Sequence, residues 1–154
     1  MSLARELIEK ASSSNVKIAA AESCTGGMLT ASLTDVPGSS AVVERGFVTY
    51  TNAAKIEMLG VSPDTLDAHG AVSEEVAGEM AKGALAASHA QIAVSITGIA
   101  GPGGSEHKPE GRVCFGLAQG SKVDTETIDF GARGRDQVRV AAREHALSLI
   151  LSKL

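Results

Sequence analysis

A serine and two glycines lie where an apolar stretch of the sequence gives way to a helix-prone one, in residues 23–27 (SCTGG). The first N–H groups of a helix lack intrahelical partners, and its dipole favours negative charge there. A hydroxyl at such a junction can be a nucleophile beside an anion-stabilising pocket, which makes Ser23 a candidate. The spacing alone favours a simpler alternative, in which Ser23 caps the helix and the glycines ease packing. Substrate contacts are expected from the residues that follow in this turn: Thr25, Gly26 and Gly27.

A lysine falls within an apolar arc of a short expected helix. At about 100° per residue, Lys55 lies between Met58 and Leu59 on the helical wheel. A buried amine is costly unless it snorkels or has a task, and desolvation lowers its pKa toward that of a general base. Serine with lysine is a known catalytic pairing, and no His–Asp set lies near Ser23 in the sequence. A snorkelling lysine remains the alternative.

A glycine-rich segment, residues 97–105 (TGIAGPGGS), directly follows an expected strand. It can present several backbone N–H groups to an anion such as a phosphate, and it matches neither the Walker pattern nor the dinucleotide fingerprint. We expect ligand contact from Thr97, Gly98 and Gly101; the alternative is a flexible loop.

Two arginines near the last expected helix, Arg135 and Arg139, are four residues apart and share a helix face. Guanidinium groups in this arrangement suit an oxyanion or a phosphate, so both are candidate substrate-binding residues.

The cysteines and histidines indicate less. Adjacent side chains rarely both face a pocket, so we expect Ser23 to face it and Cys24 to pack inward. A hydrolase that uses Cys24 as its nucleophile is the alternative. The four histidines are scattered without ligand spacing, and neither cysteine has a nearby thiol partner. We therefore expect no metal site and no cofactor.

Composition bounds the class of protein. The 154 residues are 44% hydrophobic and 21% charged, with a net charge of −4, which fits a single domain over residues 1–154. No Trp, one Tyr and three Phe provide no stacking platforms, and the charge is acidic, so no nucleic-acid partner is expected. Two cysteines make no disulfide framework and no segment resembles a membrane span, so we expect a cytoplasmic protein with no membrane partner. The composition also suits a symmetric homo-oligomer.

Apolar periodicity and turn residues divide the chain into alternating helices and strands. Asn52 and Asp136 are expected helix caps, and Val140 is expected on the buried face of the last helix. The pattern predicts an α/β fold: a three-layer α/β/α sandwich with a mixed, mostly parallel sheet that includes one hairpin. Ligands bind beyond the carboxyl ends of strands in such folds, where residues 22–27, 50–55 and 97–104 are expected. Strands are expected over residues 16–21, 42–50, 92–97, 113–118 and 123–130, with helices between and around them.

Six ordered motifs together resemble the C-terminal domain of the competence-damage-inducible protein CinA, a family whose stand-alone members are nicotinamide-nucleotide amidases. The resemblance covers nearly the whole chain. The motifs are residues 21–27 (AESCTGG), 46–50 (GFVTY) with Asn52 and Lys55, 69–74 (HGAVSE), 95–102, Lys108-Pro109, and 134–136 with Arg139.

This resemblance implies an amidase domain that hydrolyses the carboxamide of nicotinamide mononucleotide to nicotinate mononucleotide and ammonia. It implies Ser23 as nucleophile, Lys55 as its base and Tyr50 as a support for the pair. Two departures lie in the glycine-rich loop, which is about one residue shorter than the family form and has Glu110 in place of an apolar residue. The alternative function is a non-catalytic nucleotide-binding or regulatory module linked to competence.

Overall fold

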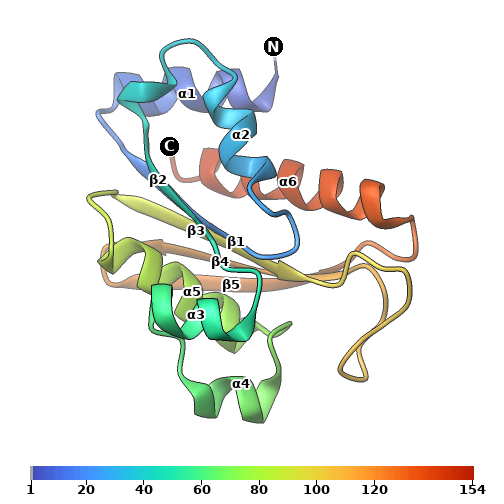
Figure 1. Ribbon diagram of the computed structural model, residues 1–154. Coiled ribbons are helices and arrows are strands. Elements are labelled where there is room, and N and C mark those ends of the chain that lie inside the picture. The colour runs from blue at the N-terminus through green and yellow to red at the C-terminus, as the bar shows by residue number, and fades with distance from the viewer. Residues whose placement is uncertain (1) are drawn as a thin grey trace.

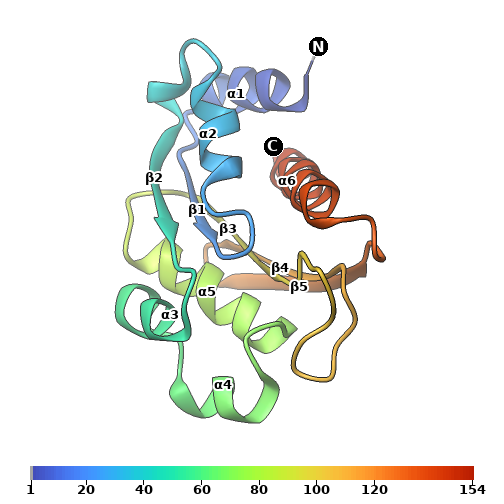
Figure 2. The ribbon, with the colours of Figure 1, turned by 45° about the vertical axis from the view of Figure 1, so that its right-hand side comes forward.

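The computed structural model describes residues 2–154, which fold into three layers (Figure 1). A five-stranded sheet separates two groups of three helices (Figure 2). One face carries α1 (Leu3–Ser13), α2 (Met28–Thr34) and α6 (Arg135–Leu151), and the other carries α3 (Asn52–Leu59), α4 (Pro63–His69) and α5 (Glu74–Ala86). The expected α/β/α sandwich is confirmed.

The strands run in the order β2-β1-β3-β4-β5 across the sheet. β1 is parallel to β2 and to β3, whereas β4 is antiparallel to β3 and to β5. The mixed sheet and its hairpin are confirmed, although parallel and antiparallel pairings are equally many because β4 reverses direction relative to both neighbours. A short 3₁₀ turn, η1 (Ser39–Ala41), precedes β2. The strands are β1 (Ile18–Glu22), β2 (Val43–Val48), β3 (Ile92–Gly98), β4 (Arg112–Gln119) and β5 (Lys122–Asp129).

Burial explains why these segments become strands. β1 is buried at every residue because helices cover both faces of the sheet at its centre. β5, at one edge, alternates exposed with partly buried residues, as a strand with one covered face does. Within residues 2–154, no helix is long and apolar enough to cross a membrane.

Three helix details differ from the sequence-based expectation. Thr51, not Asn52, caps α3, because its hydroxyl accepts a hydrogen bond from the Ala54 amide at 3.1 Å. α6 begins at Arg135 after Gly134, so Asp136 lies in the first turn rather than at the cap. Val138 is buried in α6 while Val140 is only partly buried.

The parallel pairing of β1 with β2 and β3 has a direct consequence for function. In the register, Glu22 at the end of β1 is opposite Val48 and Ile96, so the carboxyl ends of three strands meet at one edge. The segments that follow these strands emerge at this edge (Figure 2). The fold therefore brings together the three segments expected to bind a ligand.

Close packing of α3 against α5 predicts an unusual glycine effect. A Cβ on Gly83 would overlap the carbonyl of Leu59, the last residue of α3, whereas a Cβ on Gly78 would meet side-chain methyl groups, of Thr125 at 3.2 Å and of Val123 at 3.6 Å. We expect Gly83→Ala to lower the free energy of unfolding by about 1–3 kcal/mol despite the better helix propensity of alanine. Gly78→Ala, in the same helix, should change it by less than about 1 kcal/mol. Urea denaturation measures both; equal effects would contradict the packing argument.

Candidate active site

Ser23 and Lys55 lie side by side although 32 residues separate them in the chain. Ser23 follows β1, and Lys55 is on the buried face of α3 beside Leu59. The Lys55 Nζ atom is 3.0 Å from Ser23 Oγ, and it is also 3.0 Å from the Thr49 carbonyl oxygen and 3.3 Å from that of Tyr50. Lys55 is only 1% exposed, so this lysine does not snorkel to solvent.

The surroundings of Lys55 favour an uncharged amine. Burial lowers the pKa of Lys55 from its ordinary value, against weaker opposing effects of Cys24 and Glu106. Within residues 2–154, Lys55 takes part in no ion pair with a carboxylate. A neutral amine has two N–H groups, which match the two carbonyl oxygens, and one lone pair, which can accept the Ser23 hydroxyl proton. The geometry thus allows Ser23 and Lys55 to act as a nucleophile and its base.

Tyr50 contacts the pair through its backbone. Its carbonyl oxygen is 3.3 Å from Lys55 Nζ and 3.5 Å from Ser23 Oγ, whereas the residue as a whole is 57% exposed. The phenol oxygen accepts a hydrogen bond from Arg135 Nη2 at 2.9 Å, and Arg135 Nη1 donates to the Gly101 carbonyl at 2.7 Å. Arg135 therefore connects the Tyr50 side of the site to the glycine-rich loop.

The turn after Ser23 is held by internal hydrogen bonds. The Gly26 amide donates to the Ser23 carbonyl at 3.0 Å. The Arg139 guanidinium donates to the carbonyls of Cys24 and Thr25 at 3.0 and 3.2 Å, so Arg139 fastens this turn to α6. Within residues 2–154, the Cys24 amide has no acceptor in another residue. As the N–H that follows the nucleophile, it is a candidate donor to an oxyanion.

A cavity of about 440 Å³ opens beside the pair. Of the residues expected at the site, the structure brings Ser23, Tyr50, Lys55, Thr97, Gly98, Gly101 and Arg135 to its wall. It does not bring Thr25, Gly26, Gly27 or Arg139 there, because the Thr25 carbonyl and Gly26 face Arg139 of α6 and Gly27 lies against Val48 of β2. Among the described residues of the wall, Lys55 supplies the amine and Arg135 the guanidinium.

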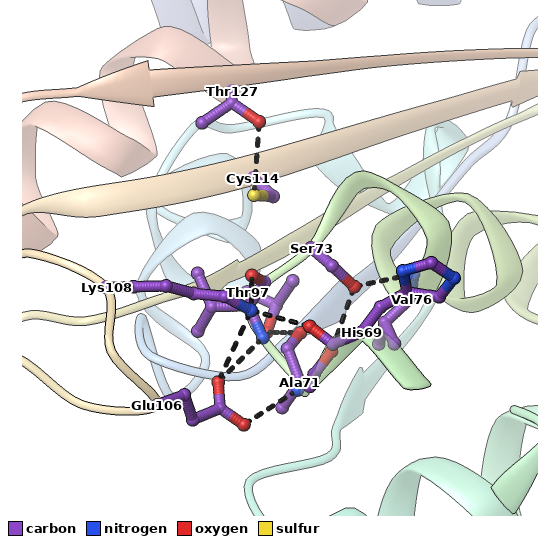
Figure 3. Close-up of polar contacts among 11 residues, drawn as sticks. His69, Ala71, Ser73, Val76, Thr97, Glu106, Lys108, Cys114 and Thr127 are labelled. Carbon is purple, nitrogen blue, oxygen red and sulfur yellow. Dashed lines mark hydrogen bonds and ion pairs between the residues drawn. The ribbon is translucent and has the colours of Figure 1, made fainter. Parts of the chain in front are cut away.

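Sequence reasoning assigned no role to one wall of this cavity, formed by Ala71, Val72 and Glu106. The Glu106 carboxylate accepts hydrogen bonds from the amides of Ala71 and Val72 at 3.0 and 3.3 Å (Figure 3). Lys108 Nζ donates to the carbonyls of His69 and Val72, both at 2.6 Å, and Thr97 Oγ1 donates to the Ala71 carbonyl at 2.9 Å. These contacts clamp the loop onto the α4–α5 connection. The sequence signals for this wall are the family motifs at residues 69–74 and Lys108-Pro109, together with the opposite charges of Glu106 and Lys108.

Glu110, the acidic residue that departs from the family pattern, lies under the same loop. Its carboxylate accepts a hydrogen bond from the Gly103 amide, and a Cβ on Gly101 would meet its side chain at 2.6 Å. The Gly103 amide is therefore occupied within the loop. Fewer amides remain for an anion than the glycine content of residues 97–105 suggests.

An α/β sandwich with a serine–lysine pair in a cleft at the carboxyl edge of its sheet defines the class of this chain. The chain belongs to the CinA C-terminal domain family, whose model matches residues 1–154.

Two groups of known proteins resemble the chain closely. A CinA-like protein of Chlorobium phaeobacteroides is 54% identical over 90% of this chain, and a nicotinamide-nucleotide amidohydrolase PncC of Shewanella oneidensis is 46% identical over 99% of it. The chain spans about a third of the length of these two relatives. A protein of the same PncC name from Enterobacter agglomerans is 52% identical, with 87% of this chain and 82% of that protein covered.

Solved structures agree with the fold. A competence/damage-inducible protein from Agrobacterium tumefaciens has a TM-score of 0.94 at 46% identity, covering 97% of this chain and 92% of that one. A CinA superfamily protein from Escherichia coli has a TM-score of 0.95 at 35% identity, covering 99% and 88%.

The position of Cys24 predicts an unreactive thiol. Burial raises the pKa of Cys24 to about 12, and the residue is 5% exposed. We expect iodoacetamide at pH 8 to alkylate Cys24 at least about 1,000-fold more slowly than a free cysteine, because almost no thiolate is present. Intact mass of the Cys114→Ala variant isolates Cys24, and the same variant in guanidinium chloride is the control. Rapid labelling of the folded variant would contradict this and favour the alternative in which Cys24 is the nucleophile.

Proposed function

We propose that this chain hydrolyses the carboxamide of nicotinamide mononucleotide to nicotinate mononucleotide and ammonia, with Ser23 as nucleophile and Lys55 as its base. The observation that carries this proposal is the 3.0 Å approach of a buried amine, free of any carboxylate partner within residues 2–154, to the Ser23 hydroxyl. The names of two relatives supply the substrate, and one of these relatives is matched over 82% of its own length.

Acylation begins with the neutral Lys55 amine. Ser23 Oγ forms a bond to the carboxamide carbon as its proton passes to Lys55 Nζ. The oxyanion that develops accepts hydrogen bonds from the Cys24 amide and from amides of the glycine-rich loop. The adduct then collapses: the carbon–nitrogen bond breaks, the nitrogen takes the proton from the Lys55 ammonium, and ammonia leaves. Proton transfer of this kind contributes about 10²–10⁴-fold, and one oxyanion donor about 10²–10³-fold.

Deacylation uses the same base. A water oxygen attacks the ester carbon as its proton passes to Lys55, and Ser23 Oγ leaves and regains a proton from Lys55. The product is the carboxylic acid, which ionises to nicotinate mononucleotide. Each group thus returns to its starting state after one turnover.

Arg135 is the side chain we assign to the phosphate. It lines the cavity, and two of its N–H groups reach Gly101 and Tyr50, which leaves others for a phosphate oxygen. The guanidinium of Arg139, the other candidate arginine, donates its hydrogen bonds to carbonyls of the turn after Ser23. Recognition of the phosphate separates the mononucleotide from free nicotinamide.

The decisive experiment incubates the pure chain with nicotinamide mononucleotide and measures ammonia. We expect steady release by the wild-type chain and none above background by Ser23→Ala, with both folded by circular dichroism. Ser13→Ala, an exposed serine of α1, is the matched control. An inactive wild-type chain that still binds the mononucleotide is the behaviour of a regulatory module and overturns the amidase proposal. Full activity in Ser23→Ala removes Ser23 from the mechanism.

The role of Lys55 predicts a pH profile. The active form is the neutral amine, so kcat/KM should fall as the pH drops below the pKa of Lys55, which burial holds below its ordinary value. Lys55→Met should lose at least about 100-fold in kcat and with it this acidic limb. Lys82→Met, an exposed lysine of α5, should retain both. A loss confined to KM would make Lys55 a substrate-binding group instead.

A further inference from the structure

The residue before the nucleophile is a buried carboxylate. Glu22 ends β1 and is 1% exposed. Its Oε1 atom accepts hydrogen bonds from Thr25 Oγ1 at 2.7 Å and from the Leu29 amide at 2.9 Å. Its Oε2 atom accepts from the Thr30 amide at 3.0 Å and from Thr30 Oγ1 at 2.7 Å. All four partners donate, which is the arrangement that an ionised carboxylate accepts.

No cation neutralises this group: within residues 2–154, Glu22 forms no ion pair with Lys, Arg or His. A buried charge without such a partner is expensive, so its four hydrogen bonds must be well formed for the fold to keep it. A group that served only to fill the core would be replaced at lower cost by an apolar side chain. The geometry of its partners indicates what Glu22 does there.

The partners belong to two segments. Thr25 lies in the turn that carries Ser23, and Leu29 and Thr30 belong to α2. Glu22 therefore joins the turn to the helix, while Arg139 holds the carbonyls of the same turn from α6. Gly46 of β2 packs directly against Thr30, since a Cβ at residue 46 would lie only 2.7 Å from Thr30 Oγ1. The carboxylate is thus a fixed point between strand, turn and helix.

We infer that Glu22 is a positioning residue: through the Thr25 hydroxyl it holds the turn so that Ser23 Oγ stays beside Lys55 and the Cys24 amide faces the developing oxyanion. The inference rests on the proposed amidase function. It gives Thr25, which lies outside the cavity, a role in orienting the turn rather than in contacting substrate.

The structure supplies a matched pair of variants. Thr25 and Thr30 each donate one hydroxyl hydrogen bond of 2.7 Å to the same carboxylate, but only Thr25 lies in the turn. We expect Thr25→Val to lower kcat for nicotinamide mononucleotide about 10–100-fold with KM changed less than about twofold, since a small misplacement of reacting groups costs that much. Thr30→Val should lower the unfolding midpoint while kcat stays within about twofold of wild type. Thr25→Ser, which keeps the hydroxyl, should restore kcat.

Equal kcat values for Thr25→Val and Thr30→Val, or a Thr25→Val defect that Thr25→Ser does not rescue, would overturn the positioning role. In Glu22→Gln an NH₂ group replaces one carboxylate oxygen and faces hydrogen-bond donors instead of acceptors. If that variant folds, its kcat should fall at least as far as that of Thr25→Val. Because the threonine pair replaces a hydroxyl by a methyl group of similar volume, the test does not depend on Glu22→Gln folding.

A second readout separates this inference from the proposed function. A fluorophosphonate probe labels an activated serine regardless of the natural substrate, and intact mass reports the rate. If the wild-type chain is labelled at Ser23 but releases no ammonia, the amidase function fails, and the labelling rates of Thr25→Val and Thr30→Val still decide the role of Glu22. A wild-type chain that neither releases ammonia nor is labelled overturns both, because Ser23 is then not activated.

Discussion

The arrangement of the site depends on the burial of one amine, that of Lys55. Lys55 is held in the interior with two backbone carbonyls and one hydroxyl around its nitrogen. Carbonyl dipoles satisfy its N–H groups without supplying the negative charge that would keep it protonated. The Thr49 amide in turn donates to the Glu22 carbonyl at 2.9 Å, so the strand that carries Ser23 also fixes the carbonyl that orients Lys55. Lys55 and Ser23 are therefore positioned by the same stretch of backbone.

The charged side chains around Ser23 and Lys55 lie in two places, behind the turn and on the wall of the cavity. Glu22 and Arg139, on the side of the turn away from the cavity, hold Ser23 in place, and Arg135 faces the cavity. The same burial that lowers the pKa of the Lys55 amine raises that of the Cys24 thiol, because desolvation disfavours the charged form of each. Lys55 and Cys24 are thus both shifted toward their neutral forms for one physical reason.

Much of this arrangement is predictable from the sequence, and the remainder has identifiable causes. Alternating apolar segments predict the sandwich, and parallel strands bring residues 23, 55 and 97 to one edge. The direction in which a single side chain points is harder to predict. Arg135 and Arg139 share a helix face in the sequence, yet Arg135 reaches the cavity and Arg139 reaches the turn. The buried role of Glu22 was missed, since a glutamate beside a serine carries no sign of burial until the start of α2 packs onto it.

Arg135 has a consequence for how the cleft is entered. Its guanidinium donates hydrogen bonds to the Tyr50 phenol and to the Gly101 carbonyl, and so it joins the two sides of the cavity opening. An anion that binds its remaining N–H groups meets a guanidinium that these two hydrogen bonds already hold in place. Binding of the anion and formation of the two Arg135 hydrogen bonds are then coupled by one free energy, which is the same in both directions. Losing either hydrogen bond weakens the hold on the anion, and a bound anion strengthens both.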